Sequence, residues 1–100
     1  MAKRNADYGF LRGRARSISS VDDLVEAYAD KIEDAAVIVF STAVFAYGSR
    51  KIRPSNAIEE IIRMAIPYAY REGLSKREYS QLGELVEILV RPIGKEYNFF

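Results

Sequence analysis

The sequence predicts an all-α protein, a small bundle of three main helices with a basic N-terminal arm. Apolar residues recur at helical spacing in three segments, a helix-capping residue precedes each segment, and glycine or proline separates them. The predicted helices span residues 20–47, 55–72 with a break at Pro67, and 75–91. The 100 residues are expected to form a basic arm at 1–18 and one helical domain at 19–100.

The first predicted helix is the longest and would extend about 42 Å. Ser20 is a favourable N-cap, Asp23 stands at the capping-box position, and Gly48 is a natural C-cap. Residues 35–47 (AAVIVFSTAVFAY) are almost wholly apolar. Three helices of this size would struggle to enclose a helix that is apolar on nearly every side. We therefore expect residues 35–47 to contact other protein subunits or a second copy of the chain.

An alternative for part of this segment is a buried strand. Residues 37–40 (VIVF) are rich in β-branched side chains, which favour strands. The helix is the favoured interpretation, because no partner strand is visible and Ala43 and Ala46 continue the helical spacing.

The second and third predicted helices have clear boundary signals. The second begins at Ser55 or Asn56, and Gly73 with the apolar residue after it matches a Schellman ending. The third begins with a complete capping box at residues 75–78 (SKRE) and is expected to end at Pro92 and Gly94. The tail at 95–100 closes with aromatic residues, which either pack back on the core or dock on a partner, and packing is favoured.

Composition excludes several classes of function. The chain has no cysteine and no histidine, so disulfides, thiolate metal sites and the usual general base are absent. Glu26, Asp30, Glu33 and Asp34 share a helical face that could hold a divalent cation with another chain, but a solvated acidic face is favoured. We expect no enzyme activity, no metal and no cofactor.

Targeting and spanning signals are also missing from the sequence. No signal peptide is present, and the apolar run at 35–47 is shorter than the ~20 residues that cross a bilayer. The expectation is a soluble cytoplasmic protein with no membrane partner. Ten arginines against three asparagines and one glutamine fit a thermophile.

Positive charge is concentrated in two stretches although the net charge is only +1. The arm carries basic residues interleaved with aromatic ones, and a short basic connection follows the first helix; both suit a nucleic-acid backbone. The candidate contacts are Arg12, Arg14, Arg16, Arg50, Lys51 and Arg53. The arm could instead be a frayed terminus, and the connection could simply complement the helix dipole.

Residues 69–82 (AYREGLSKREYSQL) resemble a DNA-binding helix-turn-helix. In that interpretation the groove-facing residues are Ser75, Lys76, Arg77, Ser80 and Gln81. Glu72 and Pro67 depart from the pattern, and any helix hairpin with a capped second helix has similar residues.

In size, helical make-up and its basic connection (GSRKIRP, residues 48–54), the chain resembles the small subunit of archaeal type I-A CRISPR effector (Cascade) complexes. The resemblance implies a subunit that lines the bound nucleic acid without cutting it. Archaeal viral nucleoproteins share the same features.

Three functions follow from these patterns. The first is a non-catalytic helical subunit of a nucleoprotein complex that contacts the nucleic-acid backbone. The second is a dimeric helix-turn-helix regulator that uses residues 69–82. The third is a helical adaptor between proteins, for which charge reversal in the basic connection would change nothing.

Overall fold

The computed structural model describes residues 21–48 and 51–100, and these residues form five helices and no strand. The helices are α2 (Val21–Ala27), α3 (Ala29–Tyr47), α4 (Pro54–Ala65), α5 (Tyr68–Glu72) and α6 (Lys76–Glu96). The all-α prediction is confirmed, and the strand considered at residues 37–40 is wrong, because these residues lie inside α3. The basic arm predicted at 1–18 and the N-cap Ser20 lie outside the described residues.

The long first helix is interrupted once, at Tyr28. Its backbone angles (φ −109°, ψ 17°) leave the helical region and separate α2 from α3. The hydrogen bonds nevertheless continue, since the Tyr28 N–H donates to the Leu24 carbonyl at 3.2 Å and the Ile32 N–H donates to the Tyr28 carbonyl at 2.9 Å. The Tyr28 ring lies 5.7 Å from that of Tyr70. A contact so distant in sequence could not be predicted from local spacing.

The second predicted helix is divided at Pro67, as expected. It begins slightly earlier than predicted, with Pro54 in its first turn and Arg53 extended before it (φ −69°, ψ 142°). Proline is favourable at that position because the missing N–H would have had no partner within the helix. α4 ends at Ala65, and α5 begins directly after Pro67.

The connection from α5 to α6 corrects one prediction and confirms another. Gly73 has φ −80° and ψ −3°, so the left-handed Schellman ending is wrong. The capping box is confirmed: the Glu78 N–H donates to Ser75 Oγ at 3.1 Å, and the Ser75 N–H donates to Glu78 Oε1 at 2.8 Å.

α6 passes through Pro92 and Gly94 instead of ending there, so the predicted end at residue 91 is wrong. Proline removes one hydrogen bond, to the carbonyl of Ile88. Both Pro92 and Ile88 are exposed, so water can satisfy that carbonyl. The extra turn is held from the other side by the tail, whose Phe99 N–H donates to the Gly94 carbonyl at 2.8 Å.

The aromatic end of the chain packs on the core, which is the alternative that the sequence analysis favoured over docking on a partner. Phe99 is buried, and its ring centre lies 4.8 Å from that of Phe40 in α3. The Phe100 ring lies against Gly94, where any side chain would collide with it. The tail therefore joins the end of α6 to the middle of α3.

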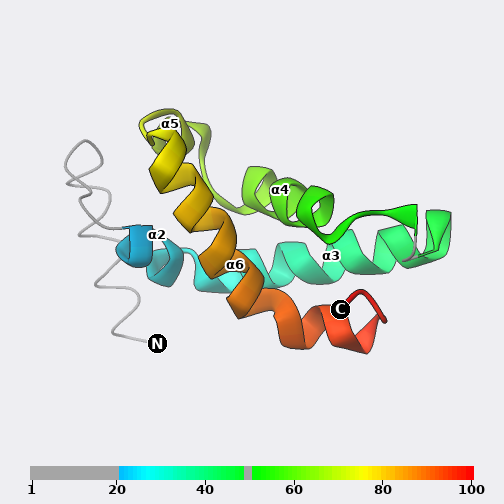
Figure 1. The fold of residues 1–100 in the computed structure, drawn as a ribbon. Helices are drawn as coiled ribbons and strands as arrows, with labels where there is room; N and C mark the ends of the chain where they lie inside the picture. Colours follow the sequence, from blue (N-terminus) through cyan, green and yellow to red (C-terminus); the bar gives the residue numbers. More distant parts are fainter. Residues whose placement is uncertain (1–20, 49–50) are drawn as a thin grey trace.

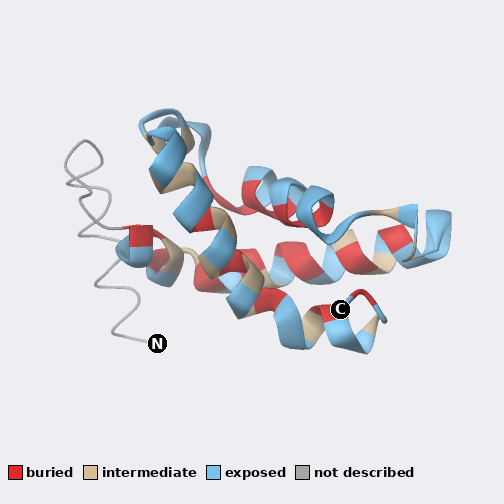
Figure 2. Ribbon diagram, in the orientation of Figure 1, coloured by how far each residue is buried: buried red, intermediate tan, exposed pale blue. Residues whose placement is uncertain are grey.

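α3, α4 and α6 enclose the core, with α4 alongside α3 and α6 crossing both (Figure 1). α2 packs against α6. The buried faces of these helices point toward one another (Figure 2). The largest fully buried side chains are Leu24, Ile32, Phe40, Ile61, Ile62, Ile66, Leu82, Val86 and Val90. Among the described helices none is both long and apolar enough to cross a membrane.

Candidate interaction surface

The second half of α3 is apolar on two opposite sides, and only one of them is covered. Ala36, Phe40 and Ala43 are buried against α4, α6 and the tail. On the other side Phe45 is 90% exposed and Ile38 is 52% exposed. Figure 2 shows how much of the C-terminal part of α3 is uncovered. The described chain therefore does not enclose this helix, which is the situation that the apolar run predicted.

The uncovered side forms one continuous stripe, which we call the outer face of α3. Its members are Val37, Ile38, Ser41, Val44 and Phe45. These positions repeat at intervals of three, four and seven residues, so they fall within roughly 120° of the helix circumference. Exposed apolar side chains gathered in this way are typical of a protein–protein contact.

Ser41 stands at the centre of the outer face and does not interrupt its apolar character. Its hydroxyl donates to the Val37 carbonyl at 2.6 Å and lies 3.2 Å from the Ile38 carbonyl. A polar group whose hydrogen bond is already made within the helix can be buried at small cost.

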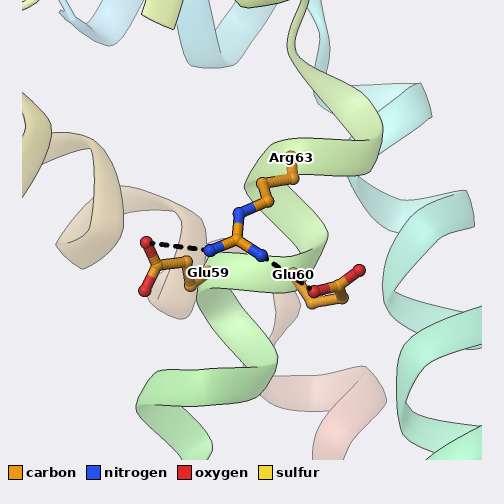
Figure 3. A network of polar contacts seen from close by, with 3 residues as sticks. All are labelled: Glu59, Glu60 and Arg63. Atoms are coloured by element: carbon orange, nitrogen blue, oxygen red, sulfur yellow. Dashed lines mark ion pairs between the residues drawn. The ribbon is translucent and has the colours of Figure 1, made fainter.

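A groove of about 490 Å³ runs beside the outer face, between α3 and α4. Ile38 and Val39 line one wall, Met64 and Ile52 line the other, and Glu60 stands at its edge. The Arg63 guanidinium lies between Glu59 and Glu60, with N–O distances of 3.7 and 3.5 Å (Figure 3). These groups are about half exposed, so the ion pairs contribute little stability. Arg63 offsets part of the negative charge of the two glutamates at the edge of this mostly apolar groove.

The basic connection leads directly from the end of α3 to α4. The Lys51 N–H donates to the Gly48 carbonyl at 3.1 Å and closes a turn. Arg53 immediately precedes α4. Both side chains are exposed, and neither forms an ion pair with another described residue. The other predicted backbone contacts, Arg12, Arg14, Arg16 and Arg50, lie outside the described residues.

The residues of the possible helix-turn-helix lie elsewhere on the molecule. All five predicted groove-facing residues are exposed at the start of α6: Ser75, Lys76, Arg77, Ser80 and Gln81. The preceding helix, α5, has five residues, none of them buried. Figure 1 places the start of α6 at the opposite end of the molecule from the basic connection. The two candidate nucleic-acid surfaces therefore do not merge.

The acidic side chains of α2 and α3 are mostly exposed, and Glu33 is half-buried. Within the described ranges no group of three acidic residues is close enough to hold a metal ion.

The sequence identified the apolar segment at 35–47 but not the groove, nor which residues of the segment form the outer face. Both depend on which side of α3 packs against α4 and α6. A segment that is apolar on nearly every side gives no sign of which side that is. Comparisons with protein-family profiles, with curated proteins and with solved structures found no match.

Proposed function

We propose that this chain is a non-catalytic helical subunit of a nucleoprotein complex. The outer face of α3 would contact a neighbouring subunit, and the basic connection after α3 would contact the nucleic-acid backbone. The observation that carries the proposal is the position of two exposed cations at the end of the uncovered apolar helix, Lys51 and Arg53, neither of which forms an ion pair with another described residue.

The physical basis of the backbone contact is electrostatic. Cations that neutralise phosphates release condensed counterions, so this kind of binding weakens steeply as salt rises. Two positive charges on one short segment make few phosphate contacts for a single protein. In an assembly held together through apolar faces, the other subunits would contribute further phosphate contacts.

The resemblance to the small subunits of type I-A CRISPR effector complexes suggests one setting for such a chain. A subunit that lines nucleic acid without cutting it needs an assembly surface and a phosphate-contacting surface. We assign these roles to the outer face of α3 and to the basic connection. Archaeal viral nucleoproteins have the same two requirements.

A second candidate is a sequence-reading regulator that uses the start of α6. The observation in its favour is that Lys76, Arg77 and Gln81 are exposed on a helix with a complete capping box. Groove reading would show as a large preference for one duplex sequence, whereas backbone binding is indifferent to sequence.

The test is a fluorescence-anisotropy titration of the whole chain against random single-stranded DNA, single-stranded RNA and duplex DNA at two salt concentrations. The variants are Arg50/Lys51/Arg53→Glu and, as a matched control at the other end of the molecule, Lys76/Arg77→Glu. The proposal predicts salt-sensitive binding that the first variant loses and the second retains. Loss in the second variant alone would favour the regulator, and absence of binding in the unaltered protein would favour an adaptor between proteins.

A further inference from the structure

The outer face of α3 is symmetric about its central residue. Val37 and Ile38 stand four and three residues before Ser41, and Val44 and Phe45 stand three and four residues after it. Reversing the direction of the helix therefore places Phe45 on Val37 and Val44 on Ile38. We propose that two copies of this chain pair through this face, with their α3 helices antiparallel and the two-fold axis at Ser41.

This pairing makes the same surface complementary to itself, as a two-fold dimer requires. This dimer rests on the proposed function, which makes the outer face of α3 the contact with a neighbouring subunit. It identifies that neighbour as a second copy of the chain.

Ser41 suits the position on the axis because its side chain is small. Helices approach most closely where small residues meet, at the lower end of the usual ~8–10 Å separation. The hydroxyl is already hydrogen-bonded to the Val37 carbonyl at 2.6 Å, so the axis buries no unsatisfied donor.

Charges at the two ends of the stripe favour the antiparallel direction. Asp34 lies on the same line of the helix, seven residues before Ser41, and is exposed. Seven residues after Ser41 comes Gly48, whose carbonyl accepts the hydrogen bond that holds Lys51 in its turn. An antiparallel pair places Asp34 of each copy beside Lys51 of the other, whereas a parallel pair places like charges together.

Phe45 is the expected anchor of the contact. It is 90% exposed, and across the axis it meets Val37 and Ile38 at the mouth of the groove between α3 and α4. Large aromatic side chains that enter such hollows carry most of the binding energy in protein interfaces. The contact takes up Lys51 and leaves Arg50 and Arg53 of each copy for phosphate.

The first measurement is the mass of the unaltered chain by size-exclusion chromatography with light scattering at high micromolar concentration. The proposal predicts a dimer of the 11.4 kDa chain. Phe45→Glu should raise the dissociation constant more than about 30-fold. Ile88→Glu is the matched control, because Ile88 is 64% exposed on α6 and lies outside the stripe; it should leave the dimer intact. A monomeric unaltered chain, or equal loss in both variants, would overturn the proposal.

Cysteine cross-linking tests the direction, since the chain has no cysteine of its own. Ser41→Cys should form an intermolecular disulfide, because a residue on the axis meets its own copy within the ~7 Å that a disulfide permits between Cα atoms. Val37→Cys alone should not cross-link, but a mixture of Val37→Cys and Phe45→Cys chains should. Efficient cross-linking of Val37→Cys alone would show a parallel pair and contradict the antiparallel arrangement.

A charge exchange separates this inference from the proposed function. Asp34→Lys should weaken the dimer, and adding Lys51→Asp to the same chain should restore it, because both ion pairs are then rebuilt in reverse. No restoration would count against the antiparallel contact. Nucleic-acid binding is measured separately by anisotropy. If the chain binds nucleic acid as a monomer, the dimer is refuted but the proposed function is not. If the chain forms the dimer but binds no nucleic acid, the proposed function is refuted but the dimer is not.

Discussion

Phe40 joins α3 to the C-terminal tail, and its removal should be the most costly change in this part of the core. The side chain is fully buried. Its ring centre lies 4.8 Å from that of Phe99 and 6.0 Å from that of Phe100, which it meets edge-on. Truncating a buried phenylalanine to alanine costs about 3–5 kcal/mol. A domain of this size has only about 5–15 kcal/mol of stability, so Phe40→Ala should leave it marginally folded.

The assay is urea unfolding followed by circular dichroism, with Phe40→Leu as a milder variant that should cost less than Phe40→Ala because it leaves a smaller cavity. Ile88→Ala is the control, because an exposed side chain on α6 should change stability by no more than about 0.5 kcal/mol. A double-mutant cycle of Phe40→Ala with Phe99→Ala should give a coupling of about 0.5–1.5 kcal/mol. A cost for Phe40→Ala no larger than that of the control, or strictly additive changes in the cycle, would refute the packing of the tail on α3.

Three further changes have effects that follow from single contacts, and thermal unfolding would measure each. Ser75→Ala removes the acceptor for the Glu78 N–H and should destabilise the protein by about 1 kcal/mol, whereas Ser75→Asp should restore most of it. Gly48 has φ 77° and ψ 136°, so Gly48→Ala should cost about 1–3 kcal/mol; an unchanged midpoint would mean that the turn has another conformation. Arg63→Ala breaks two exposed ion pairs and should cost less than about 1 kcal/mol, with the difference vanishing at high salt.

The sequence was most informative where a boundary depends on local chemistry. The capping box at Ser75 and Glu78, the interruption at Pro67 and the ending at Gly48 all involve hydrogen bonds or backbone angles within a few residues. Such signals are present in the order of residues itself, and the structure has all three.

Predictions failed where a distant contact decided the outcome. α6 continues past Pro92, and the tail that follows donates a hydrogen bond from the Phe99 N–H to the Gly94 carbonyl and packs its Phe99 ring on Phe40 in α3. The interruption at Tyr28 likewise accompanies a contact with Tyr70 in another helix.

The candidate surface was predictable only in part, for the same reason. The apolar run at 35–47 indicated that something must cover it. Its division into a buried side around Phe40 and an outer face around Ser41 required the positions of α4 and α6. Lys51 and Arg53 are exposed, so the basic connection lies at the surface. Their role in binding phosphate stays a prediction.

The most direct test of the central claim is the salt dependence of binding to random single-stranded nucleic acid. Each phosphate contact contributes about 0.7 to the slope of log K against log salt for a single strand. If Arg50 and Arg53 each contact a phosphate, while Lys51 pairs with Asp34 of the second copy, Arg50/Arg53→Glu should lower the slope by about 1.4, and Lys76/Arg77→Glu should leave it unchanged. An equal slope for the Arg50/Arg53→Glu variant and the unaltered protein would contradict the account.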